Sequence, residues 1–286
     1  MRIGITGSHG FIGQHLACFL SKRRDLKIRR FDRKKHDLSD ISSLRPFVKD
    51  LDVLYHLAGA NRAENADLIR INFLGTSNLV DATKRYGNPD KIKIIFASSF
   101  QVYAPRKTEE AVDEKVPADP QTLFGIAKRS AEDLLRLSGI NTAVARISNT
   151  YGPLCRPFYN SVISTFCELV RRDKEIQVNG DGSQSRDFIF IEDVVHALEK
   201  LAEHSFRGTQ TYNLCGGKLY TLKDIIQGLE EASGKKIRAV YNKNAEPRLY
   251  LRGDNRKIKR AIGWKPEIPF REGLEKTYRW FEKQPY

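Results

Sequence analysis

A glycine-rich turn near the start of the chain has the spacing of a phosphate-binding loop. Gly7, Gly10 and Gly13 follow a short apolar run and stand before an amphipathic stretch. The first glycine permits a tight turn, the second lets a pyrophosphate approach the backbone, and the third lets a helix pack closely on the preceding strand. The helix would offer free N–H groups and the positive end of its dipole to the phosphates. We therefore expect a dinucleotide site here.

A carboxylate about 20 residues further on would complete such a site, because it can accept hydrogen bonds from the adenosine ribose hydroxyls. Asp32 ends the second apolar run and fits this position. Its charge would repel a 2′-phosphate, which favours NAD. Arg33 and Lys34 follow directly and could instead hold the phosphate of NADP, so NADP stays open as the alternative. Asp37 and Leu38 are the expected contacts to the adenine.

The elements that would position these residues alternate between strand and helix along the first half of the chain. Short apolar runs predict strands over 2–6, 27–31, 53–57, 92–97 and 142–147. Helical spacing of apolar residues predicts helices over 11–22, 41–48, 67–86 and 122–137. This alternation is typical of a doubly wound α/β fold, in which helices cover both faces of a parallel sheet.

The second half of the chain is less regular. We expect helices over 161–172, 221–233 and 270–281, and a strand running into a helix over 188–202. The loop at 151–159 contains Gly152, Pro153 and Pro157 and is the expected crossing between two domains. We predict a dinucleotide-binding domain over 1–150, which also takes back part of 186–215, and a smaller substrate-binding domain over 151–286.

The composition narrows the choice of partners. The formal net charge of +14 favours an anionic partner, which could be nucleic acid, a membrane surface or a phosphorylated small molecule. The sequence has no known nucleic-acid-binding module and no apolar run of about 18 residues. Its widely spaced cysteines predict neither a disulfide framework nor a metal site: Cys18, Cys155, Cys167 and Cys215. We expect a cytoplasmic protein that binds a phosphorylated small molecule and neither nucleic acid nor membrane.

Seven segments, in the same order along nearly the whole chain, resemble the extended short-chain dehydrogenase/reductase family in its NAD-dependent epimerase/dehydratase branch. They are T-G-S-H-G-F-I-G (6–13), H-L-A-G-A (56–60), I-N-F-L-G-T-S-N-L-V-D-A (71–82), A-S-S-F-Q-V-Y (97–103), R-I-S-N-T-Y-G-P (146–153), S-R-D-F-I-F-I-E-D-V (185–194) and I-G-W-K-P (262–266). The resemblance implies a Rossmann-like sheet, NAD as cofactor and a nucleoside diphosphate sugar as substrate. It also implies a homodimer held by a four-helix bundle, with Leu79, Leu134 and Leu137 facing outward.

The resemblance also assigns residues to the two ligands. The expected cofactor contacts are Gly7, His9, Gly10, Phe11, Ile12, Gly13, Asp32, Arg33, Asp37, Leu38, Leu57, Ala58, Gly59, Asn72 and Lys128. The expected substrate contacts are Ser99, Gln101, Asn149, Arg186 and Arg248, with Arg252 as a further candidate. Ser99 would supply the active-site hydroxyl, and Arg186 would meet the substrate diphosphate.

The catalytic helix departs from the family pattern at one position. The family carries a tyrosine four residues before a lysine, a spacing that places both side chains on one face of a helix. Here Lys128 is in place, but Phe124 stands where the tyrosine belongs. Phenylalanine cannot exchange a proton. Three explanations stay open: an engineered Tyr→Phe change, a native enzyme that uses Ser99, Tyr103 or a water instead, and a protein that binds ligands without turnover.

The residues after Ser99 bear on the reaction. The family's 4,6-dehydratases have an acidic pair there, whereas this chain has Phe100 and Gln101, so a dehydratase is not expected. We expect an NAD-dependent nucleotide-sugar epimerase that acts through a 4-keto intermediate. One alternative is an NADP-dependent 4-keto reductase of capsular or O-antigen type, since segments 56–62, 155–167 and 175–178 resemble reductases of capsular polysaccharide biosynthesis. The other is an inactive protein that binds NAD(P) and a nucleotide sugar.

Overall fold

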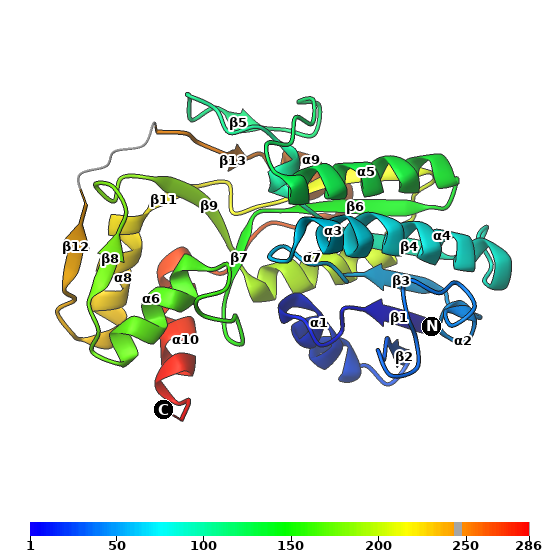
Figure 1. Cartoon of the computed structure of the whole chain (residues 1–286), viewed down its shortest axis with the longest axis horizontal. Helices are drawn as coiled ribbons and strands as arrows, with labels where there is room; N and C mark the ends of the chain where they lie inside the picture. The colour runs from blue at the N-terminus through cyan, green and yellow to red at the C-terminus, as the bar shows by residue number, and fades with distance from the viewer. Residues whose placement is uncertain (243–247, 286) are drawn as a thin grey trace.

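A six-stranded parallel sheet is the centre of the larger part of the molecule. The computed structural model describes residues 1–242 and 248–285. In it the strands follow the order β10-β6-β4-β3-β1-β2 (Figure 1). Their bounds are β1 Arg2–Thr6, β2 Lys27–Arg30, β3 Val53–His56, β4 Lys93–Ser99, β6 Thr142–Ile147 and β10 Thr209–Leu214. All five strand pairings are parallel, which confirms the predicted doubly wound α/β fold.

Helices cover both faces of this sheet because its strands carry apolar side chains on both sides. On one face lie α1 (Phe11–Ser21) and α7 (Ile191–Glu203), and on the other α2 (Arg45–Val48), α4 (Gly75–Tyr86) and α5 (Leu123–Ser138). Neighbouring residues of one strand alternate between the two cores: Tyr55 packs with α1 and α7, whereas Leu54 packs with α2 and α4. No helix among the described residues has the length and hydropathy needed to cross a membrane.

The smaller part of the molecule lies beside the carboxyl ends of these strands (Figure 1). A three-stranded sheet, in the order β11-β9-β7, joins the two parts. Its strands are β7 Asn149–Tyr151, β9 Ser185–Phe190 and β11 Leu219–Thr221. The other elements of this part are α6 Val162–Arg171, β8 Ile176–Val178, α8 Leu222–Ser233, β12 Ala239–Tyr241 and α10 Phe270–Glu282. The helix α9 (Arg256–Ile262) packs instead on β10 of the large sheet. A short pair, β5 (Ala111–Val112) with β13 (Arg252–Gly253), lies to the left of α5 in the same view.

The chain passes between the two parts more than once. After β7 and β9 it returns to the large sheet, where α7 covers one face and β10 pairs with β6. The strand and helix over 185–203 extend the predicted range of 188–202 at its start. The division into domains at residue 150 remains a prediction.

Two predicted helices are wrong in their extent. The helix expected over 41–48 is a single turn over Arg45–Val48, because the preceding residues form side-chain turns. There the Asp40 carboxylate accepts hydrogen bonds from the backbone N–H and the hydroxyl of Ser42, which compete with helix formation. The helix expected over 67–86 is divided into α3 (Asn65–Ile69), a π-helical turn η1 (Arg70–Leu74) and α4.

One expected surface residue is buried. The resemblance predicts that Leu79 faces outward, but Leu79 is only 1% exposed and packs in the core between α4 and the sheet. That expectation is wrong because the apolar side of α4 faces the sheet. Leu137, near the end of α5, is 72% exposed.

Candidate active site

The glycine-rich turn between β1 and α1 is shaped by close backbone approaches. Gly7 has a φ of 67°, and a Cβ there would lie 2.7 Å from the Ala58 nitrogen. A Cβ on Gly13 would overlap the Gly7 carbonyl group. The N–H of Gly10 donates to the Gly7 carbonyl at 2.9 Å, and no side chain caps α1 at Gly10. The first N–H groups of α1 therefore suit an anionic group, so these residues fit a dinucleotide diphosphate.

The residues expected around the adenosine form the loop after β2. The Asp32 carboxylate accepts a hydrogen bond from the Lys34 backbone N–H at 2.9 Å, and the side chains of Arg33 and Lys34 are exposed. The Asp37 carboxylate accepts from the Ser39 backbone N–H at 2.8 Å. Leu38, next to it, is partly buried, and its carbonyl oxygen accepts from Asn78 of α4 at 2.8 Å. His9 is exposed in the glycine turn, beside the hydroxyl of Ser8. Phe11 and Ile12, in the first turn of α1, are partly buried.

A buried histidine links the glycine turn to the next cofactor segment. His56, at the end of β3, lies 2.8 Å from the Thr6 hydroxyl through Nδ1 and 2.9 Å from the Thr76 hydroxyl through Nε2. Thr76 donates to the Asn72 carbonyl at 2.7 Å, so His56 must donate to Thr76 from Nε2 and accept from Thr6 at Nδ1. Thr6 in turn accepts from the Ala58 N–H at 3.2 Å. Burial lowers the pKa of His56 to about 3, so the ring is neutral.

Asn72 holds the segment that follows β3. Its Nδ2 donates to the carbonyl oxygens of Ala60 at 2.7 Å and Leu68 at 2.9 Å, and its Oδ1 accepts from the Ala60 N–H at 3.3 Å. Asn72 lies in the π-helical turn, a feature often found at functional sites. The extra residue of this turn brings the amide to residues 57–60, which contain the expected cofactor contacts Leu57, Ala58 and Gly59.

Lys128 lies against the same segment. A Cβ on Gly59 would come within 2.8 Å of the Asn72 Oδ1 and 3.1 Å of the Lys128 Nζ, so these three residues converge. The ammonium donates to the Ala97 carbonyl at 2.9 Å and lies 4.8 Å from the centre of the Phe96 ring. Burial lowers the pKa of Lys128 to about 8, against an opposing effect of the Glu132 carboxylate.

The start of α5 places Phe124 near the end of β4. Thr122 caps α5 by accepting from the Gly125 N–H at 3.0 Å, and its hydroxyl donates to the Gln101 side chain at 2.9 Å. A Cβ on Gly125 would overlap the Gln101 carbonyl group, so only glycine lets the helix approach this closely. The Gln101 N–H donates to the Ser99 hydroxyl at 3.2 Å. These contacts hold the first turn of α5, which contains Phe124, against Gln101, whose N–H bonds to Ser99.

Tyr103 is held away from this turn. Its buried hydroxyl accepts from Arg146 at 2.7 Å and donates to the Asn213 side chain at 2.9 Å. Arg146 also pairs with the buried Glu132 at 2.6 Å. Burial raises the pKa of Tyr103 to about 12. Tyr103 is therefore a structural residue, and Ser99 or a water remains as the group that could replace the missing phenol.

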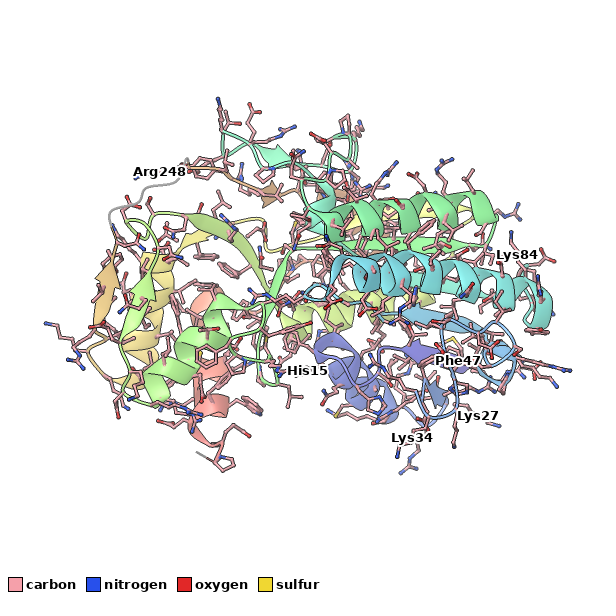
Figure 2. The ribbon with its side chains drawn as sticks, viewed as in Figure 1. His15, Lys27, Lys34, Phe47, Lys84 and Arg248 are labelled. Carbon is pink, nitrogen blue, oxygen red and sulfur yellow. The ribbon has the colours of Figure 1, made fainter. Side chains whose placement is uncertain are left out.

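The expected substrate residues divide into two places. Asn149 donates to the Asp187 carbonyl at 3.0 Å, directly beside the exposed Arg186 on β9. Arg248 instead pairs with Asp181 at 3.2 Å, and both side chains are more than half exposed. Figure 2 shows Arg248 beyond the strands of the smaller part, well away from His15. The further candidate Arg252 donates to the Glu109 carbonyl at 2.9 Å.

Two hydrogen bonds tie the crossing loop to the larger part of the molecule. His15 of α1, labelled between the two parts in Figure 2, lies 2.8 Å from the Pro153 carbonyl oxygen. The Tyr159 hydroxyl donates to the Arg62 carbonyl at 3.4 Å, next to the segment that Asn72 holds. The loop at 151–159 therefore contacts both α1 and the segment after β3, which contain expected cofactor residues. Across the described ranges, no group of three or more His, Cys, Asp or Glu is placed to hold a metal ion.

Comparison with known proteins agrees with this arrangement. Residues 3–215 match the model of the NAD dependent epimerase/dehydratase family. The chain belongs to this family. Among its relatives is a Methanocaldococcus jannaschii protein with the provisional name UDP-glucose 4-epimerase, which is 29% identical over 97% of each chain.

Two solved structures of similar fold carry ligands. RMD from Pseudomonas aeruginosa, complexed with NADPH, is 28% identical and superposes with a TM-score of 0.88 over 98% of this chain and 97% of its own. A UDP-glucuronic acid 4-epimerase from Bacillus cereus, in complex with UDP-glucuronic acid and NAD, is 25% identical. Its TM-score is 0.83 over 99% of each chain. Members of similar fold thus bind either nicotinamide cofactor.

Proposed function

We propose that this protein is an NAD-dependent nucleotide-sugar epimerase that acts through a 4-keto intermediate. The observation that carries the proposal is the convergence of Lys128, Asn72 and Gly59 beside the carboxyl end of β4, where Ser99 lies. Ligands of parallel α/β sheets bind at the carboxyl ends of the strands. The glycine turn and the uncapped start of α1 lie at the same edge.

Each proposed site residue has a role that its position supports. The first N–H groups of α1 bind the cofactor diphosphate, and Asp32 accepts from the adenosine ribose. Lys128 donates to the nicotinamide ribose with the N–H bonds that Ala97 leaves free. NAD, when bound, supplies the acceptor and donor of the hydride at C4 of the sugar. Ser99 binds the C4 hydroxyl, and Asn149 and Arg186 bind the sugar diphosphate.

Removal of the proton from the C4 hydroxyl is the step that Phe124 cannot assist. A phenol at this position would stand one helical turn before Lys128, whose positive charge would favour the phenolate. Without it, Ser99 or a water must take the proton. Three alternatives predict different outcomes of one assay. They are an engineered Tyr→Phe change, a native enzyme that uses Ser99 or water, and an inactive binding protein.

That assay incubates the chain and its Phe124→Tyr variant with NAD and UDP-, GDP- or dTDP-sugars, and separates the epimers by chromatography. Mass spectrometry of any nucleotide that copurifies identifies the base and the sugar. Epimer formation by either protein supports the proposal. Tight binding without conversion by either protein would overturn the epimerase and leave the binding protein.

A second candidate is an NADP-dependent 4-keto reductase of polysaccharide biosynthesis. The exposed Arg33 and Lys34 beside Asp32 favour it, as does the likeness to a structure complexed with NADPH. A 4-keto nucleotide sugar and NADPH would then be consumed together, with no need for NAD. The cytoplasm is the proposed setting of either reaction, supported by four cysteines that are all free thiols.

A further inference from the structure

The buried carboxylate of Asp187 connects the expected diphosphate-binding residues, Arg186 and Asn149, to two segments that are distant in the sequence. Asp187 follows Arg186 on β9, and its side chain is 0% exposed. Its Oδ1 accepts from the Gly216 N–H at 2.8 Å, and its Oδ2 accepts from the N–H groups of Gly217 and Gly253, each at 3.0 Å. Its own carbonyl oxygen accepts from Asn149 at 3.0 Å. One residue thus connects β7, β9, the turn after β10 and β13.

The residues that donate these hydrogen bonds must be glycines, because a side chain would clash with its neighbours or would strain the backbone. A Cβ on Gly216 would overlap the Phe188 carbonyl, and Gly217 has a φ of 77°. A Cβ on Gly253 would lie 2.5 Å from the Cys215 sulfur. Bare backbone therefore surrounds the carboxylate on three sides. In the described part of the chain, no lysine or arginine pairs with it. Three backbone N–H groups donate to it, and the Ser148 hydroxyl also favours its charged form.

A buried carboxylate without a cationic partner lowers the stability of the fold, so we expect a role that depends on the position of Asp187. Burial raises the pKa of Asp187 to about 6 in spite of the three N–H donors. Side chains alternate along a strand, so Asp187 points into the protein while the neighbouring Arg186 is exposed. Any shift of Asp187 would move Arg186 with it and, through the carbonyl oxygen, would also move Asn149. The carboxylate thereby sets where both diphosphate-binding groups stand.

We propose that Asp187 is a positioning residue for the sugar diphosphate, which it serves by locking Arg186 and Asn149 against the Gly216–Gly217 turn and β13. The inference rests on the proposed function, because it concerns the substrate side of the same site. Loss of the carboxylate should weaken nucleotide binding and leave cofactor binding unchanged, since none of its contacts belongs to the expected cofactor residues.

The test compares Asp187→Asn with a matched control, Asp193→Asn. Asp193 is also a buried carboxylate, and it too accepts from backbone N–H groups, those of Glu267 at 2.8 Å and Ile268 at 3.3 Å. It contacts none of the expected substrate residues. An amide at either position places N–H against N–H, so both variants should lose stability. Calorimetry with UDP, GDP and dTDP, and with NAD, measures the two affinities.

We expect Asp187→Asn to weaken binding of the preferred nucleotide about tenfold or more, with NAD affinity unchanged and Asp193→Asn like the unmodified chain. Equal nucleotide affinity in both variants would overturn the inference alone. Absence of nucleotide binding by the unmodified chain would overturn the proposed function with it. If Asp187→Asn does not fold, hydrogen exchange in the unmodified chain decides: nucleotide should slow exchange at Gly216, Gly217 and Gly253 together, and unchanged rates there would contradict the inference.

Discussion

The ammonium nitrogen of Lys128 lies 5.8 Å from the centre of the Phe124 ring. A hydroxyl on that ring would stand beside a cation whose pKa burial already lowers to about 8. We predict that Phe124→Tyr raises turnover of the true substrate by about 10²–10⁴-fold, the usual contribution of a general acid–base group. Steady-state kinetics of both proteins measures the gain.

Lys128→Ala in the Phe124→Tyr protein is the control, and it should remove the gain because the phenol loses its cationic neighbour. A normal rate in the unmodified chain, with no improvement from the phenol, would show that Ser99 or a water carries the proton.

Cofactor preference should depend on Asp32. We predict that the chain binds NAD(H) more tightly than NADP(H), and that Asp32→Ala reduces or reverses this preference because a 2′-phosphate is no longer repelled. Calorimetric titration of the four cofactor forms measures it. Asp37→Ala removes the same charge from the same loop at an expected adenine contact, which both cofactors share, so it should leave the ratio unchanged. Tighter NADP(H) binding by the unmodified chain would favour the reductase.

Acid should destabilise the fold through His56. Its pKa is about 3 in the folded chain and about 6.5 when exposed, so the unfolded chain takes up a proton that the folded chain does not. The stability contributed by neutral His56 is complete above pH 6.5 and is lost as the pH falls toward 3. We predict that His56 contributes about 2 kcal/mol less to the free energy of unfolding at pH 5 than at pH 7, measured by urea titration as the difference between the chain and a variant without this histidine.

His56→Gln keeps a donor and an acceptor but does not titrate, so its loss over the same interval should be smaller. Asp187 acts in the opposite direction, because its raised pKa adds stability as the pH falls through about 6. Both proteins contain Asp187, so the difference between them isolates His56. Equal losses would contradict the prediction.

Assembly should depend on the exposed apolar side chains of η1 and α5. Leu74, Ile126 and Leu137 are 48%, 46% and 72% exposed. We predict a homodimer that covers them, and a monomer when Ile126 and Leu137 are both replaced by glutamate, measured by light scattering. Val240→Glu alters an exposed apolar residue of β12 and should leave the assembly unchanged. A monomeric unmodified chain at micromolar concentration would contradict the prediction.

Local patterns in the sequence predict five of the six strands of the large sheet, because the hydrophobic pattern of a strand can be recognised within the strand itself. The sixth strand, β10, was not predicted. Strands 2–6 and 142–147 have the predicted bounds. The π-helical turn could not be predicted in this way, since Asn72 bonds to Ala60, which lies twelve residues earlier in the loop after β3. The burial of Leu79 likewise depends on how α4 rotates against the sheet.

The site residues that sequence reasoning missed are those whose partners are far apart in the chain. No sequence pattern around Asp187 predicts its contacts with Gly216, Gly217 and Gly253. A signal was nevertheless present, because Asp187 directly precedes the apolar run 188–190 of β9, all of which is buried. His56 carried a weaker signal of the same kind, because it stands at the end of the fully buried β3.

The placement of β10 has a consequence for how the protein is made. The sheet is completed by residues 209–214, which leave the ribosome only after much of the smaller part has been synthesised. Until then β6 is an open edge that can pair with other chains, and the face covered by Leu198 and Leu201 of α7 is bare. A fragment that ends at residue 150 should therefore aggregate, and the two parts must mature together during translation.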